Sequence, residues 1–251
     1  MPQEKIDARI DLLLRTGRLL MESGADTPRI MRNMKRTAAY LGFLERDLQI
    51  YVNINLLMVN YADGEQSFTK FKRCNRHVIN MTVISSVSKL SWRAIRENYT
   101  YEQFEAALDE IETSKPNYTT WQVAVGGGFA CGGFCIQFGC DWPAFVYASV
   151  AAILGFRLRM YLNSRGSNNY VNIAVASFVS TMLAWLLGVC NVLGSSTPWH
   201  ALMACALFIV PGVPLINFVS DMLTGYTQVG ITRAVNTLLM VLAMAFGIAF
   251  A

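Results

Sequence analysis

The polar residues best suited to bind a small ligand lie in an otherwise apolar stretch near the C-terminus. Two prolines and a glycine interrupt this stretch, and a short series of polar side chains follows them. The candidate residues for a substrate or ion pathway are Pro211, Gly212, Pro214, Asn217, Asp221 and Arg233. Because proline removes a backbone donor and clashes with the preceding turn, we expect the helix to kink or break near Val210 to Pro214. Broken helices expose backbone groups that bind solutes or ions in secondary transporters.

Asn217 and Asp221 are four residues apart and therefore share one face of a helix. Asp221 has two interpretations. It is either an interfacial cap or ion-pair partner of Arg233, or a carboxylate that binds a substrate ammonium group or carries a coupling proton. Arg233 is correspondingly either an anchor at the membrane surface or a ligand for a substrate carboxylate. The sequence leaves both interpretations open.

The chain has none of the short motifs that mark common catalytic sites. GxSxG, HExxH and the P-loop are missing, and no Cys/His pair is suited to a nucleophile or a metal. We therefore expect no enzyme activity, no cofactor and no metal site. The alternative is a membrane-anchored enzyme, or a sensor or scaffold, with its activity in the N-terminal region. Glu22, Asp26 and Asp47 are the candidate carboxylates of such an enzyme.

Charge is divided sharply along the chain. The sequence has 21 Lys and Arg and 17 Asp and Glu, but residues 121–251 hold only four arginines and two aspartates. So few charges cannot cover a water-soluble domain, whereas an apolar domain can have lipid as its solvent. We expect a soluble cytoplasmic α+β domain over residues 1–116 and an α-helical polytopic membrane domain over residues 117–251. The mixed charge of the N-terminal region predicts no nucleic-acid partner.

Five apolar stretches are long enough to cross a bilayer. They lie near residues 119–139, 143–162, 170–191, 199–218 and 232–250. Arg157, Arg159 and Arg165 flank the second connection and Arg233 flanks the fourth, whereas the first and third connections contain no Lys or Arg. Because basic residues concentrate on the cytoplasmic side, we predict a cytoplasmic N-terminal domain and a C-terminus on the far side of the membrane.

An odd number of spans has a consequence for assembly. Many transporters join two repeats of opposite orientation, and a five-span unit can only have an inverted twin. The chain is therefore expected to be half of a transporter, completed by a second five-span protein; the alternative is a self-contained homo-oligomer. Within the first span, Gly128 and Gly132 form a GxxxG pattern that permits close helix packing, or else a thin helix beside a substrate path.

The N-terminal region combines helical and strand periodicities. Apolar spacing predicts helices over residues 3–23, about 27–42, 78–97 and 101–113. Asp26 is the expected capping side chain of the second helix. Residues 48–61 alternate with period two, which predicts one strand, and Asp63-Gly64 predicts a hairpin to a returning strand. This order predicts a small α+β domain.

These features together resemble the bacterial threonine/serine exporter family. The resemblance rests on Ser23-Gly24-Ala25-Asp26-Thr27 leading to Leu41-Gly42, on the five apolar stretches, and on the string from Pro211 to Arg233 with Gly225 and Gly230. It implies a subunit of a secondary exporter for a threonine- or serine-type amino acid or a C4 dicarboxylate, driven by the proton gradient across the bacterial inner membrane.

A chain with five spans resembles the split form of that family. In the split form a second, smaller membrane subunit completes the transporter, as in the two-subunit succinate exporter, whose larger subunit this chain resembles. The resemblance therefore implies a small-molecule substrate, the lipid bilayer and the smaller subunit as partners, and allows assembly into a higher oligomer.

Overall fold

The computed structural model describes residues 3–64, 67–74 and 78–251, and the chain forms two compact units. The first unit combines Met1–Lys115 with Gly212–Val235, and the second combines Pro116–Pro211 with Asn236–Ala251. The segment Gly212–Val235 carries most of the candidate pathway residues. These residues therefore pack with the N-terminal region despite their long separation in sequence.

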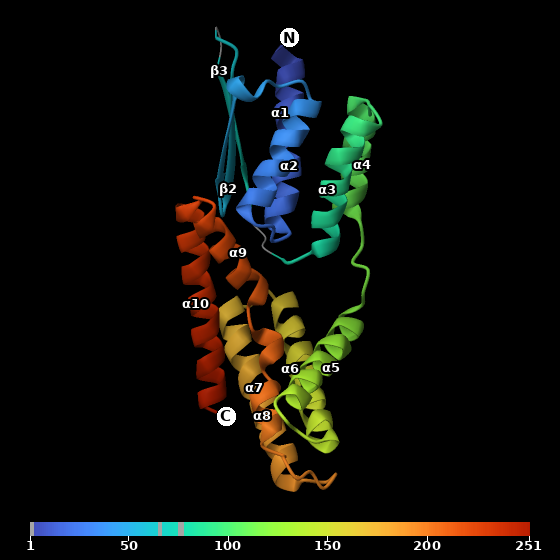
Figure 1. Cartoon of the computed structure of the whole chain (residues 1–251), viewed down its shortest axis with the longest axis vertical. Helices are drawn as coiled ribbons and strands as arrows, with labels where there is room; N and C mark the ends of the chain where they lie inside the picture. Colours follow the sequence, from blue (N-terminus) through green and yellow to red (C-terminus); the bar gives the residue numbers. More distant parts are fainter. Residues whose placement is uncertain (1–2, 65–66, 75–77) are drawn as a thin grey trace. The chain divides into compact units, whose positions relative to one another are not determined.

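The first unit contains an α+β domain built in layers (Figure 1). A three-stranded antiparallel sheet packs on α1 and α2, and α3 and α4 pack against the other side of these helices. The elements of the unit are α1 (Gln3–Glu22), α2 (Thr27–Tyr40), the 3-10 turn η1 (Glu45–Asp47), β1 (Leu48–Asn53), β2 (Leu56–Ala62), β3 (Ser67–Arg73), α3 (Met81–Arg96), α4 (Tyr101–Thr113) and α9 (Gly212–Leu223). Leu13, Met34, Leu57, Ile84 and Phe104 are among the buried side chains that join these layers into one core.

The sheet corrects one prediction from the sequence. Residues 48–61 form two strands, β1 and β2, and not one, because the chain turns back after Asn53. The missed signal is a shift of phase: Val52 and Leu57 are both buried in the core although they are five residues apart, an odd spacing that one strand cannot provide. The hairpin predicted at Asp63-Gly64 is confirmed by the antiparallel pairing of β2 with β3.

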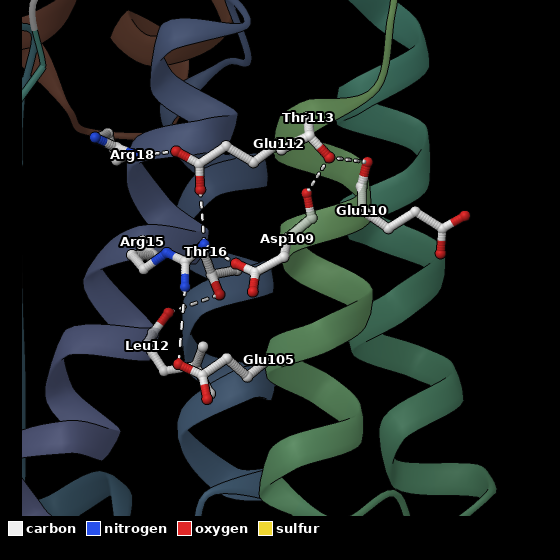
Figure 2. A network of polar contacts seen from close by, with 9 residues as sticks. All are labelled: Leu12, Arg15, Thr16, Arg18, Glu105, Asp109, Glu110, Glu112 and Thr113. Carbon is white, nitrogen blue, oxygen red and sulfur yellow. Dashed lines mark hydrogen bonds and ion pairs between the residues drawn. The ribbon is translucent and has the colours of Figure 1, made fainter.

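An ion network joins the first and last helices of this domain (Figure 2). Arg15 on α1 lies among Glu105, Asp109 and Glu112 on α4, and Arg18 also pairs with Glu112. Arg15 Nη2 donates to Glu112 Oε2 at 2.7 Å. Because these side chains are partly exposed, each single pair adds little stability. Three carboxylates around one guanidinium nevertheless hold α4 in place along α1.

The second unit is built from helices. It contains α5 (Thr120–Gln137), α6 (Trp142–Ser164), α7 (Asn169–Cys190), α8 (His200–Ala204), the 3-10 turn η2 (Leu207–Ile209) and the last part of α10 (Thr227–Ala249). By length and composition, α6, α7 and α10 can each cross a membrane, and α8–η2 with α9 makes a fourth span if the pair is one broken span. The glycine-rich α5 has 18 residues and is not among the helices of the described residues that are long and apolar enough to be candidate spans. The count of five spans stays a prediction.

The helix breaks where the prolines predict. The turn η2 ends at Ile209, and Val210 and Pro211 precede the start of α9 at Gly212. Val210 has φ −54° and ψ 122°, the extended conformation that a following proline favours. Pro214 lies in the first turn of α9, where its missing N–H has no intrahelical partner to lose.

Gly128 and Gly132 allow α5 to approach α6 closely. A Cβ atom on Gly128 would lie 2.8 Å from the carbonyl oxygen of Ser149, and one on Gly132 would lie 2.7 Å from the ring of Phe145. Both distances are shorter than a methyl group can adopt without displacing its neighbour. The two glycines therefore set the separation of these helices.

Replacement of Gly132 by leucine is expected to separate α5 from α6 and to lower the free energy of unfolding by at least about 1–3 kcal/mol, the usual cost of overpacking. Gly133→Leu is the matched control, because nothing lies within 4 Å of a Cβ atom built at Gly133. The measurement is the yield of monodisperse protein in detergent and its melting temperature. Equal behaviour of the two variants would contradict the packing role of Gly132.

Candidate functional site on the α9–α10 hairpin

Two helices joined by a tight turn carry the polar candidates. The turn between α9 and α10 passes through Gly225 at φ +87°, and the Tyr226 N–H donates to the Asp221 carbonyl at 2.9 Å, which closes the end of α9. Gly230 on α10 faces α9, since a Cβ atom there would lie 2.8 Å from the side chain of Met222. The close approach lets polar side chains of the two helices meet.

Asp221 and Arg233 form a buried ion pair. Arg233 Nε lies 3.2 Å from Asp221 Oδ2, and the two residues are 8% and 0% exposed. Charges removed from water are stable only when they are paired and hydrogen-bonded, so each group needs the other. The ion pair is the first of the two interpretations that the sequence left open for Asp221.

The Asp221–Arg233 pair and Asn217 on α9 contact the turn between α1 and α2. Three contacts of 2.9 Å each join a side chain of the hairpin to a backbone group of the turn: Asn217 Nδ2 to the Gly24 carbonyl, Arg233 Nη2 to the Ala25 carbonyl, and the Thr27 N–H to Asp221 Oδ1. The hairpin thus satisfies two acceptors and one donor of the segment Gly24–Thr27.

Asp221 also caps helix α2. Thr27 is the first residue of this helix, and its N–H has no acceptor within the helix. The sequence predicts Asp26 as the capping side chain, but that side chain makes no capping hydrogen bond. It lies instead 3.5 Å from the guanidinium of Arg29 and 3.5 Å from the hydroxyl of Ser220. Asp221 takes the capping role, and the dipole of α2 favours a negative charge there.

The structure brings Asn217, Asp221 and Arg233 together, whereas Pro211, Gly212 and Pro214 lie at the start of α9. The prolines therefore determine where α9 begins. The three polar side chains join α9 to α10 and the hairpin to the turn before α2.

Sequence reasoning missed the partner of the site, the turn Gly24–Thr27. The sequence identified this segment as the start of the second helix and as part of the family resemblance, but no periodic pattern connects it to α9. In the described part of the chain, no three His, Cys, Asp or Glu side chains lie close enough together to hold a metal ion.

Asp141, the other acidic residue of the apolar half, has a structural role. Its carboxylate accepts from the Ala144 N–H at 3.0 Å, the Ser195 hydroxyl at 2.7 Å and the Ser196 N–H at 2.6 Å. Desolvation alone would raise the pKa of Asp141, but the hydrogen bonds outweigh it and hold its pKa well below its usual range. Asp141 is therefore ionised near neutral pH and ties the start of α6 to the loop after α7.

Comparison with known families decides the class of protein. The family model described as "Putative threonine/serine exporter" matches residues 11–251. The chain belongs to this exporter family. The resemblance seen in the sequence is thereby confirmed, and the matched region includes both the Gly24–Thr27 turn and the α9–α10 hairpin.

Relatives within the exporter family differ in length. The "Probable succinate transporter subunit YjjP" of Escherichia coli K12 is 28% identical over 251 residues, which are 100% of this chain and 96% of that protein. The protein of the same name in Klebsiella aerogenes is 27% identical over 232 residues, or 92% of this chain and 88% of that protein. The "Probable threonine/serine exporter" of Mycobacterium tuberculosis is 21% identical over 241 residues, or 95% of this chain but 45% of that protein.

No solved structure matches the chain. Family membership and the apolar helices together indicate a multi-pass membrane protein of a transporter family.

Proposed function

We propose that this chain is one subunit of a two-component secondary exporter in the bacterial inner membrane. The exporter moves a small carboxylate out of the cytoplasm, either an amino acid of the threonine or serine type or a C4 dicarboxylate such as succinate. The family match and the names of the relatives support this proposal.

The observation that carries the proposal is the buried Asp221–Arg233 pair beside Asn217. Ionisable side chains in the apolar helices of membrane proteins mark substrate paths and proton relays. Arg233 and Asn217 supply donors for a substrate carboxylate. Asp221 supplies an acceptor for an ammonium group or carries the coupling proton, because its protonation frees Arg233 to bind the substrate. The break at Pro211 lets α9 move as a separate segment in this cycle.

A second, smaller membrane subunit completes the proposed transporter. The chain covers 96% of the Escherichia coli relative that is named a subunit, but 45% of the Mycobacterium tuberculosis exporter. The unmatched part of the longer relative leaves room for an inverted five-span half. The positions of the four arginines support a cytoplasmic N-terminal domain and a C-terminus on the far side of the membrane. The two subunits can assemble further into a higher oligomer.

Cells that carry both subunits are preloaded with L-threonine, L-serine or succinate. We expect them to export one of these three compounds, and we expect this export to stop when an uncoupler collapses the proton gradient. Cells with either subunit alone should remain at background, and the two proteins should purify together. Efflux by this chain alone, as a homo-oligomer, would contradict the two-component arrangement. Failure of both subunits to export any of the three compounds would contradict the proposed substrates.

A further inference from the structure

The Gly24–Thr27 turn contacts the hairpin through hydrogen-bonding groups similar to those of a small substrate. Two successive carbonyl oxygens of the turn accept from an amide and a guanidinium, each at 2.9 Å. One N–H of the turn donates to a carboxylate at 2.9 Å. Amide and guanidinium donors are also those that bind a carboxylate, and a carboxylate binds an ammonium group. The turn therefore occupies a set of side chains that matches a small carboxylate or an amino acid.

We propose that the Gly24–Thr27 turn is a plug, which fills the carboxylate-binding site of Asn217 and Arg233 until a substrate carboxylate displaces it. This inference rests on the proposed function, because it assigns the substrate site of the exporter. Threonine, serine and succinate share the carboxylate that the site recognises. In an exporter that loads from the cytoplasm, a cytoplasmic domain that covers this site controls access to it.

Asp221 contacts both the turn and the hairpin. Its Oδ1 accepts from the Thr27 N–H at 2.9 Å, and its Oδ2 lies 3.2 Å from Arg233 Nε. When the plug leaves, Oδ1 loses this donor and can take a proton or a substrate ammonium group.

Backbone hydrogen bonds within the N-terminal domain hold the plug in place, and these bonds do not involve the α9–α10 hairpin. The Val78 N–H donates to the Glu22 carbonyl at 2.9 Å, and the Asn80 N–H donates to the Ser23 carbonyl at 3.0 Å. Gly24 follows at φ +80°, a conformation that suits glycine. The turn can therefore separate from the hairpin and keep its shape.

A variant at Thr27 distinguishes a plug that substrate displaces from a contact that stays closed throughout transport. Thr27→Pro removes the N–H that Asp221 accepts, and proline suits the first position of a helix, where Asp26 already has the φ −67° and ψ 151° that precede a proline well. If the turn competes with substrate, the Thr27→Pro complex should bind the exported compound about three- to tenfold more tightly than the wild-type complex.

Binding is measured by calorimetry on the purified two-subunit complex, with L-threonine, L-serine and succinate as separate probes. A second measurement uses only the wild-type complex and does not depend on the folding of a variant. Amide hydrogen exchange of peptides that cover the turn should become faster when the bound compound is added, because the Thr27 N–H loses its acceptor.

The outcomes distinguish the plug from the exporter itself. Faster exchange of the turn, with tighter binding by Thr27→Pro, supports the plug. Unchanged or slower exchange in a complex that still binds and exports the compound overturns the plug and leaves the exporter intact. A complex that neither binds nor exports any of the three probes overturns the proposed function, and the plug with it.

Discussion

The Asp221→Asn variant is expected to insert into the membrane but to export no more substrate than cells that lack the chain. Asparagine retains an oxygen that accepts the Thr27 N–H, so the cap of α2 remains. It cannot be ionised, so it can neither carry a proton nor neutralise Arg233, which is 8% exposed. The measurement is efflux from preloaded cells that carry both subunits, normalised to the amount of inserted protein.

Ser220→Ala is the matched control for this experiment. Ser220 precedes Asp221 on the same helix, and its hydroxyl makes one long contact of 3.5 Å with Asp26. This variant should export at the wild-type rate. Wild-type efflux from Asp221→Asn would remove Asp221 from the transport cycle and leave it a structural residue.

Loss of the opposite charge is expected to lower the stability of the protein. The Arg233→Met variant leaves the Asp221 carboxylate, which is fully buried, without its counter-charge. Breaking a buried pair in this way typically lowers the free energy of unfolding by about 3–5 kcal/mol. The melting temperature in detergent should fall accordingly, and less of the protein should purify in folded form.

The double variant Asp221→Asn with Arg233→Met separates stability from transport. It buries no charge at this position, so most of the stability lost in Arg233→Met should return. It should still export nothing, because both proposed ligands are missing. If Arg233→Met alone melted like the wild type, Asp221 would not depend on Arg233, and the ion pair would not hold the site together.

Several features of the fold followed from local sequence. The apolar character of α6, α7 and α10 is visible in composition alone, and the break before Gly212 follows from two prolines. The division of residues 48–61 into two strands was missed because the alternation of apolar residues from Leu48 to Leu56 continues through the turn after Asn53. The cap of α2 was assigned to Asp26 since a neighbouring side chain is the usual source, whereas the carboxylate comes from α9.

The sequence by itself determined the apolar character of the second half of the chain, the position of the helix break and the unusual polar residues Asn217, Asp221 and Arg233. Each of these is a property of composition or of a few neighbouring residues. Only the tertiary structure decided what the polar residues contact. Thr27 and Asp221 are 194 residues apart, and a single hydrogen bond between distant segments leaves no periodic pattern in one sequence. Their pairing arises because burial of the Asp221–Arg233 pair requires partners for its charges, and the turn before α2 supplies them.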